Sequence, residues 1–164
     1  MTWRMAAAWA LGMALLGAAP RPSVLVFVRT DCPISNRYAP ELKRLYAAYR
    51  GRTDFRLVYV EPGLSAEQMQ HHRAEFALDM PAVLDTDRSY VRKAGVTVTP
   101  EAAVFVDGKL VYRGRIDDRF VSFGTMRPAP LHHDLEEAIT AALAGKAPPA
   151  AFTKAIGCAI EPVR

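Results

Sequence analysis

The sequence predicts a single α/β domain with a mixed central sheet flanked by helices. Two apolar runs, Ser23–Val28 and Phe55–Val60, are typical of buried strands, and each is followed by a segment with helical features. Asp107 and Gly108 lie between two later apolar runs, which is a strong hairpin signal. Strands joined through a helix run parallel and hairpin strands run antiparallel, so one sheet is expected to contain both.

The other elements follow from spacing, caps and helix breakers. Apolar residues recur at helical spacing over Pro33–Arg50, and Pro40 should kink this helix near its middle. Ser65 and Gln68 have the spacing of a capping box, which predicts a helix from there to about Leu78. The remaining expected elements are strand Pro81–Leu84, helix Arg88–Ala94, loop Gly95–Pro100, hairpin strands Ala102–Val106 and Leu110–Arg113, and helix Leu131–Ala144.

Composition and charge narrow the class of protein. The 164 residues are enough for one domain with a hydrophobic core, and 51% hydrophobic with 23% charged residues is typical of a globular protein. The 21 basic residues are spread along the chain and the net charge is +4, which argues against a nucleic-acid partner.

The first 19 residues predict export. Arg4 precedes an uncharged run, Met5–Ala19, that is shorter than a membrane span of about 20 residues and apolar on all sides. We expect a signal peptide or an N-terminal anchor at 1–19, with the protein periplasmic or tethered to the membrane facing the periplasm. An N-terminal core helix is the alternative. Residues 20–147 would form the domain, and residues 148–164 a tail.

Cys32 is the candidate reactive residue. It falls on the first turn of a helix that follows a strand, where unpaired N–H groups and the helix dipole favour a thiolate. The nearby Arg29 should lower the pKa of the thiol further, whereas burial would raise it. Ser35 can donate a hydrogen bond to the thiolate but cannot resolve a mixed disulfide. An inert, buried cysteine is the alternative.

Three motifs in order carry a resemblance to a known family: Thr30-Asp-Cys-Pro-Ile-Ser35, Pro81-Ala-Val-Leu-Asp85, and Gly95-Val-Thr-Val-Thr-Pro100 before the hairpin. Together with Pro40, which lies eight residues after Cys32, they resemble the redoxin branch of the thioredoxin superfamily. This branch includes alkyl hydroperoxide reductase/thiol-specific antioxidant proteins and exported TlpA/ResA-like reductases. Exported redoxin-domain proteins with a Cys-Pro-Ile-Ser motif, which also end in a Gly-Cys-x-Ile element, are similar over the run around Cys32.

The resemblance implies a thioredoxin-like fold in which the Thr99–Pro100 bond is cis and faces Cys32. Thr99 would then present its backbone to a substrate strand. Ser35 stands where a second cysteine is usual, and Arg29 stands where peroxiredoxins have a threonine. The expected function is thiol–disulfide oxidoreductase, with thiol peroxidase as the nearest variant. A protein thiol, a protein disulfide or a peroxide would be the substrate, and no cofactor is implied.

Cys158 is the candidate resolving cysteine. Residues 145–164 are rich in proline and alanine and show no period, which predicts an ordered or semi-ordered tail. Extended, the segment from Gly145 to Cys158 spans roughly 40 Å, so it can return to the end of the sheet where Cys32 lies. Gly157 would allow its backbone a close approach. The alternative is a disordered tail whose cysteine pairs with another chain.

Four charged residues follow the second hairpin strand and should return toward Cys32, where they could tune its pKa or bind a polar substrate. They are Arg115, Asp117, Asp118 and Arg119. A solvated loop is the alternative. A different class of function is a copper-binding or assembly module, in which Cys32 and Cys158 bind the metal, with or without one histidine. The histidines are His71, His72, His132 and His133, for which surface positions are the simpler expectation. A third possibility is a domain that binds client proteins without turnover.

Overall fold

The computed structural model describes residues 21–161 of the chain. The signal peptide or anchor expected at residues 1–19 lies outside this range. Within the range, no helix has the length and hydropathy that crossing a membrane requires.

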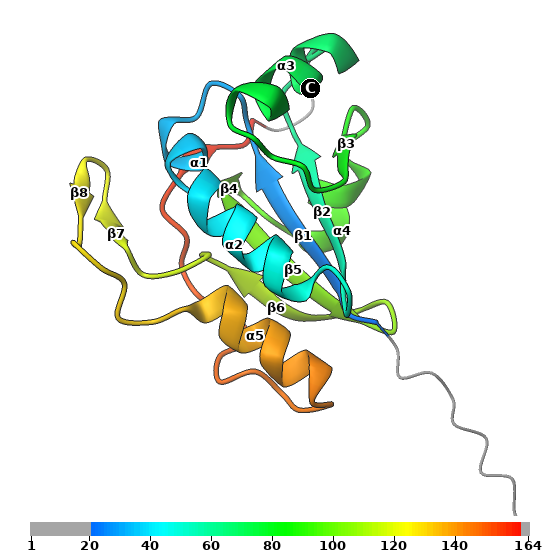
Figure 1. The fold of residues 1–164 in the computed structure, drawn as a ribbon, viewed down its shortest axis with the longest axis vertical. Helices are drawn as coiled ribbons and strands as arrows, with labels where there is room; N and C mark the ends of the chain where they lie inside the picture. Colours follow the sequence, from blue (N-terminus) through cyan, green and yellow to red (C-terminus); the bar gives the residue numbers. More distant parts are fainter. Residues whose placement is uncertain (1–20, 162–164) are drawn as a thin grey trace, which may run out of the picture.

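A five-stranded mixed sheet forms the centre of the domain, with strand order β3-β2-β1-β5-β6 (Figure 1). The strands are β1 (Ser23–Val28), β2 (Asp54–Tyr59), β3 (Ala82–Leu84), β5 (Glu101–Val106) and β6 (Lys109–Gly114). β1 pairs parallel with β2 and antiparallel with β5, and β5 and β6 form the hairpin. The predicted mixed sheet is therefore confirmed.

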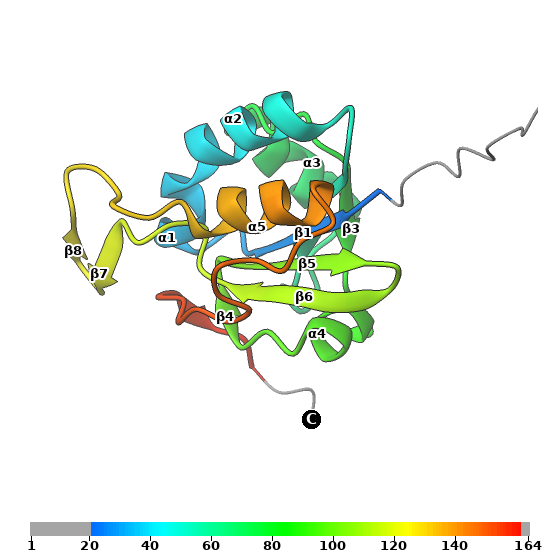
Figure 2. The same cartoon turned by 90° about the horizontal axis from the view of Figure 1, so that it is seen from below.

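Helices cover both faces of this sheet. They are α1 (Pro33–Arg37), α2 (Ala39–Tyr49), α3 (Ala66–Glu75), α4 (Ser89–Ala94) and α5 (Asp134–Leu143). In Figure 2 the helices α2, α3 and α5 lie on one side of the sheet and α4 on the other. Side chains alternate along β1, so Val24 and Val26 pack in the cluster of α2 and α5, while Leu25 and Phe27 pack in that of α4. β1 is thus buried on both faces, as its apolar run predicts.

The first helix is interrupted rather than kinked. Tyr38, with φ −83° and ψ −6°, separates α1 from α2. Pro40 lies two residues later, in the first turn of α2, and has no backbone N–H to continue the helical hydrogen bonds of α1. The interruption leaves α1 as a short segment whose N-terminus carries Cys32.

Several short strands were not expected from the sequence. β4 (Val98–Thr99) lies within the expected loop, and β9 (Cys158–Ala159) lies within the tail, where it pairs antiparallel with β4. The hairpin β7 (Phe120–Ser122) and β8 (Thr125–Met126) projects beside α1 (Figures 1 and 2). The tail is ordered where the structure describes it, because backbone hydrogen bonds tie it first to β6 and then to β4.

Candidate functional site

The β1–α1 junction buries Cys32 at a helix N-terminus. Cys32 is the N-cap residue of α1, its carbonyl accepts a hydrogen bond from the Asn36 N–H at 3.1 Å, and its side chain is fully buried. Pro33 occupies the first turn, where its missing N–H costs no hydrogen bond. The strand–helix placement predicted for Cys32 is therefore observed.

The Thr99–Pro100 segment lies directly against this cysteine. The Thr99–Pro100 peptide bond is cis, as the resemblance implies, and the Cys32 thiol donates to the Thr99 carbonyl with an Sγ–O distance of 3.1 Å. Thr99 is fully buried. Three of the expected site residues thus meet at one end of the sheet.

The tail brings the second sulfur to the same place. The Sγ atoms of Cys32 and Cys158 are 2.8 Å apart, and both residues are free cysteines. Cys158 reaches this point because β9 pairs with β4, with Cys158 opposite Thr99. A Cβ atom at Gly157 would lie 2.1 Å from the Thr99 carbonyl oxygen, so only glycine allows this approach.

The two thiols have opposite pKa shifts. Burial raises the pKa of Cys32, but hydrogen bonds from Cys158 and from the hydroxyl and backbone N–H of Ser35 outweigh it, and the pKa lies below its usual range. Burial, followed by the hydrogen bond to Cys32 and the negative charge there, raises the pKa of Cys158 to about 11. The pair therefore favours a thiolate on Cys32 and a thiol on Cys158 that donates to it.

Ser35 is placed to act on the thiolate. It is buried in α1, and its Oγ has no hydrogen-bond partner among residues 21–161. A buried hydroxyl without a partner costs free energy, and that cost is relieved when the hydroxyl turns toward a thiolate. This arrangement explains why its hydroxyl lowers the pKa of Cys32.

A hydrogen-bond network braces the loop before Cys32. The Glu61 carboxylate accepts from the N–H and hydroxyl of Thr30 at 2.7–2.8 Å, and the Asn36 amide donates to the Thr30 carbonyl at 3.0 Å. The Asn36 Oδ1 in turn accepts from His72 Nε2 at 2.9 Å, and His72 Nδ1 accepts from the Tyr59 hydroxyl at 2.8 Å. Burial lowers the pKa of His72, which favours this neutral tautomer.

His72 is thus a buried positioning residue, and the expectation of a surface histidine was wrong for it. The sequence offers one signal for its burial: it lies three residues after the buried Met69 on α3, so the two share a face. The network itself joins residues far apart in the chain and leaves no local pattern.

Arg29 affects the pKa of the second cysteine rather than standing out among the influences on Cys32. Its guanidinium pairs with Asp31 at 2.8 Å, and its charge lowers the pKa of Cys158. It is not among the main influences on the pKa of Cys32. Its expected tuning role therefore falls on Cys158.

Asp117 and Arg119 contact each other and Tyr38. The Asp117 carboxylate is buried, accepts a hydrogen bond from the Tyr38 hydroxyl at 2.6 Å and pairs with Arg119 at 3.2 Å. These contacts hold the chain after β6 against the residue that separates α1 from α2. Asp117 also does not lie in a solvated loop, because it is 1% exposed.

Arg115 and Asp118 act at the start of α5. Arg115 pairs with Asp134 at 2.7 Å, and Asp118 accepts from the N–H groups of Leu131 and His132 at 2.7 and 3.1 Å. These contacts tie the chain after β6 to the start of α5, while the chain itself continues into β7 beside α1. The prediction that the four charged residues return to the cysteine is therefore not supported by their contacts.

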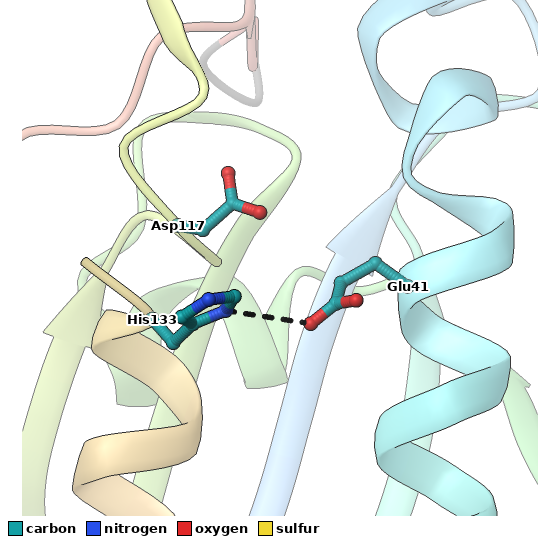
Figure 3. Close-up of side chains that lie close together, drawn as sticks. All are labelled: Glu41, Asp117 and His133. Carbon is teal, nitrogen blue, oxygen red and sulfur yellow. Dashed lines mark ion pairs between the residues drawn. The ribbon is translucent and has the colours of Figure 1, made fainter. Parts of the chain in front are cut away.

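One group of described residues has the spacing of metal ligands: Glu41, Asp117 and His133 (Figure 3). His133 Nδ1 lies 4.0 Å from Glu41 Oε1. Arg44 pairs with Glu41 at 2.7 Å and Arg119 pairs with Asp117, so two guanidinium groups already balance both carboxylates. Within residues 21–161 no comparable group contains a cysteine, so the copper alternative finds no third ligand there.

Known structures share this fold. An uncharacterized conserved protein from Geobacillus kaustophilus aligns with a TM-score of 0.75 and 24% identity over 89% of this chain and 80% of that one. The hypothetical protein SMc02350 from Sinorhizobium meliloti 1021 aligns with a TM-score of 0.73 and 20% identity over 88% and 81%. A putative thiol:disulfide interchange protein DsbE from Chlorobium tepidum aligns with a TM-score of 0.56 and 21% identity over 76% and 82%. None of the curated proteins matches the chain.

Residues 20–109 match the family described as thioredoxin-like. The match covers more than half of the chain and includes Cys32 and Pro100, but it ends before the segment that carries Cys158. The chain belongs to the thioredoxin-like family.

Proposed function

We propose that this protein is an exported thiol–disulfide oxidoreductase of the redoxin type, in which Cys32 is the nucleophile and Cys158 the resolving thiol. The observation that carries the proposal is the sulfur pair: two free thiols 2.8 Å apart with pKa values shifted in opposite directions. Export rests on the uncharged run in residues 1–19, ahead of a domain at 20–147 and a tail at 148–164.

The reaction proceeds through two exchanges. The Cys32 thiolate attacks one sulfur of a partner disulfide, the partner's S–S bond breaks, and the second partner sulfur leaves as a thiolate. Cys158 then gives up its proton and attacks Cys32 Sγ, and the first partner sulfur leaves and is protonated. The partner gains two electrons, and the protein ends with a Cys32–Cys158 disulfide.

The position of β9 determines how a substrate gains access. Thr99, which would present its backbone to a substrate strand, is already paired with Cys158. A substrate strand therefore takes the β4 edge when β9 moves aside, and β9 returns to resolve the mixed disulfide. The pairing between β4 and β9 is short and Gly157 carries no side chain, so little structure has to be disrupted when β9 leaves β4.

The names of similar structures support the class of chemistry. Besides the Chlorobium tepidum protein, a secreted disulfide oxidoreductase from Mycobacterium tuberculosis, homologous to E. coli DsbE, aligns with a TM-score of 0.50 and 20% identity over 76% of this chain. Both names describe thiol–disulfide chemistry. A protein with a disulfide or thiol is therefore the substrate class proposed here.

The test is turnover of a protein disulfide together with mapping of the cysteines. Wild type should reduce insulin disulfides with dithiothreitol as electron donor and yield a Cys32–Cys158 link on oxidation. Cys32→Ser should lose activity to the background level, because the attacking sulfur is gone. Cys158→Ser, reduced first and then mixed with insulin after the dithiothreitol has been removed, should instead accumulate a stable mixed disulfide at Cys32.

Two results would contradict the proposal. Free thiols at both positions after oxidation with diamide would remove the resolving role of Cys158. Equal activity of Cys32→Ser and wild type would remove the nucleophile. Consumption of a hydroperoxide without any disulfide reduction would reassign the protein to the thiol peroxidase variant.

A further inference from the structure

The two sulfurs differ in access as well as in pKa. Cys32 is fully buried beneath β9 and the Thr99 carbonyl, whereas Cys158 is only partly buried. A thiol arriving from solvent therefore meets Cys158 first. Once the two are joined in a disulfide, an exchange reaction begins at the sulfur that the incoming thiolate can reach.

An apolar groove of about 300 Å³ leads to Cys158. Its walls are α1, through Ile34 and Arg37, and the β7–β8 hairpin, through Phe123 and Met126. Phe123 is 68% exposed, an unusual position for a phenylalanine on a projecting hairpin. Among the residues that the structure describes, Arg37 is the one charged residue lining the groove, and no carboxylate lines it.

We propose that the disulfide form is reduced by a partner protein whose cysteine, carried on an extended segment with apolar neighbours, enters this groove and attacks Cys158 rather than Cys32. This inference rests on the proposed function, because it requires the Cys32–Cys158 disulfide. It adds which sulfur accepts the partner, the surface that receives it and the chemistry of the segment.

The exchange balances with the partner as the reductant. The partner thiolate bonds to Cys158 Sγ, the Cys32–Cys158 bond breaks, and its electron pair leaves on Cys32 as a thiolate. A second thiol of the partner then attacks the partner sulfur of the mixed disulfide and releases Cys158, which takes up a proton. The partner is oxidised by two electrons and this protein is reduced by two.

The environment of Cys32 makes it the better leaving group. Hydrogen bonds from Ser35 remain available to the departing thiolate, and a thiol of lower pKa leaves faster. Attack on Cys32 would instead expel Cys158 as a thiolate, and burial disfavours a thiolate at that position. The accessibility of Cys158 and the stability of Cys32 as a leaving thiolate therefore both favour attack on Cys158.

The groove also selects the partner. The attacking group is an anion, and Arg37 supplies the positive charge on its path, with its NH1 held near the Met126 sulfur at 3.3 Å. Apolar side chains beside the partner cysteine would cover Ile34 and Phe123 and remove their surface from water. A polar segment would gain little from the same walls.

The decisive experiment uses the full chain, oxidised with diamide and checked for the Cys32–Cys158 link. A synthetic peptide with one cysteine between leucines is added in excess, the reaction is quenched in acid, and the adduct is mapped by mass spectrometry. The peptide should be found on Cys158 with Cys32 free. An adduct mainly on Cys32 would overturn the proposal while leaving the proposed function intact. Absence of the starting disulfide would overturn the proposed function itself.

Two hairpin variants test the groove. Phe123→Ser should slow the peptide reaction about tenfold by removing an apolar wall, and should leave the reaction with glutathione within twofold. Val121→Ser is the matched control, since Val121 is 50% exposed on the same hairpin but does not line the groove. Equal rates for the peptide with Phe123→Ser and wild type would overturn the docking surface.

Discussion

The β1–α1 junction and the C-terminal segment each supply one sulfur, but different contacts hold them. The junction is buried, is braced by Glu61 and His72, and lies within the part of the chain that matches the thioredoxin-like family. The C-terminal segment lies outside that match, exposes Phe152, and is joined to the site by the short pairing of β9 with β4. The comparison indicates that the core fixes the position of Cys32, the proposed nucleophile, whereas the position of Cys158, the proposed resolving thiol, depends on the short pairing of β9 with β4.

The strongest way to break this arrangement is a side chain at Gly157. Gly157→Ala would place a Cβ 2.1 Å from the Thr99 carbonyl, and backbone atoms there cannot move aside cheaply. We expect β9 to leave β4 and the Cys32–Cys158 disulfide to close about a hundredfold more slowly, the scale of a misplacement of about 1 Å. Stopped-flow oxidation with diamide and thiol counting measures this.

Gly51→Ala is the matched control. A Cβ at Gly51 meets nothing within 4 Å, so closure should be unchanged. A similar slowing in both variants, or none in Gly157→Ala, would show that the β4–β9 pairing does not position Cys158.

The pH dependence of the two half-reactions sharpens the comparison. Because burial raises the pKa of Cys158 above its usual range, resolution should accelerate almost tenfold per pH unit from neutral pH upward and should not level off at about pH 8.5, where an ordinary cysteine would. Burial, the largest cause of that shift, persists after Cys32 has joined the mixed disulfide. Attack by Cys32 should level off at a lower pH than resolution does, because hydrogen bonds from Cys158 and Ser35 hold the pKa of Cys32 below its usual range despite burial.

The same shift has a consequence for stability. The pKa of Cys158 is higher in the folded chain than in an unfolded one. The protonated thiol therefore stabilises the fold below about pH 8.5, and this contribution is lost as the pH rises to about 11.

For the kinetic prediction, rapid-quench experiments with separate detection of the mixed disulfide distinguish attack by Cys32 from resolution by Cys158. Parallel pH profiles for attack and resolution would contradict the difference between the two sulfurs.

The smallest effect is expected at Ser35. Ser35→Ala removes the hydroxyl that lowers the pKa of Cys32 and also removes a buried oxygen without a partner. The pKa of Cys32 should rise and its reaction at neutral pH should slow about threefold, while stability stays equal or increases. Thiolate absorbance against pH provides the readout, and Ser35→Thr should keep most of the wild-type value. An unchanged titration in Ser35→Ala would remove the serine from the site.

Local patterns predicted most of the fold. The strands β1, β2, β5 and β6 and the capping box at Ser65 follow from apolar runs, a hairpin turn and a cap. The missed elements are β4, β7, β8 and β9, each two or three residues long. Such strands are too short to show a period, and the pairing of β4 with β9 joins segments far apart in the chain.

The sequence predicted those parts of the site that depend on a local motif or on how far the chain can reach. The position of Cys32 follows from its strand–helix junction, and the length of the tail allowed Cys158 to return. The hydrogen-bond partners of His72 and Asp117 could not be foreseen, because Asn36 and Tyr38 come from distant elements. A charged residue in a loop gives no local sign that a buried tyrosine will meet it.

Hydrogen bonds at Thr153 hold the chain in place a short distance before β9. Its N–H donates to the Arg113 carbonyl at 3.1 Å, and its hydroxyl bonds to that of Tyr112 at 2.7 Å. With that anchor in place, Cys158 can move no farther than about 17 Å from Thr153 even when β9 has left β4. Such confinement corresponds to an effective concentration of millimolar or more at Cys32. Free thiols at micromolar concentration would therefore compete poorly, and each mixed disulfide at Cys32 would be resolved within the same molecule before a second protein reaches it.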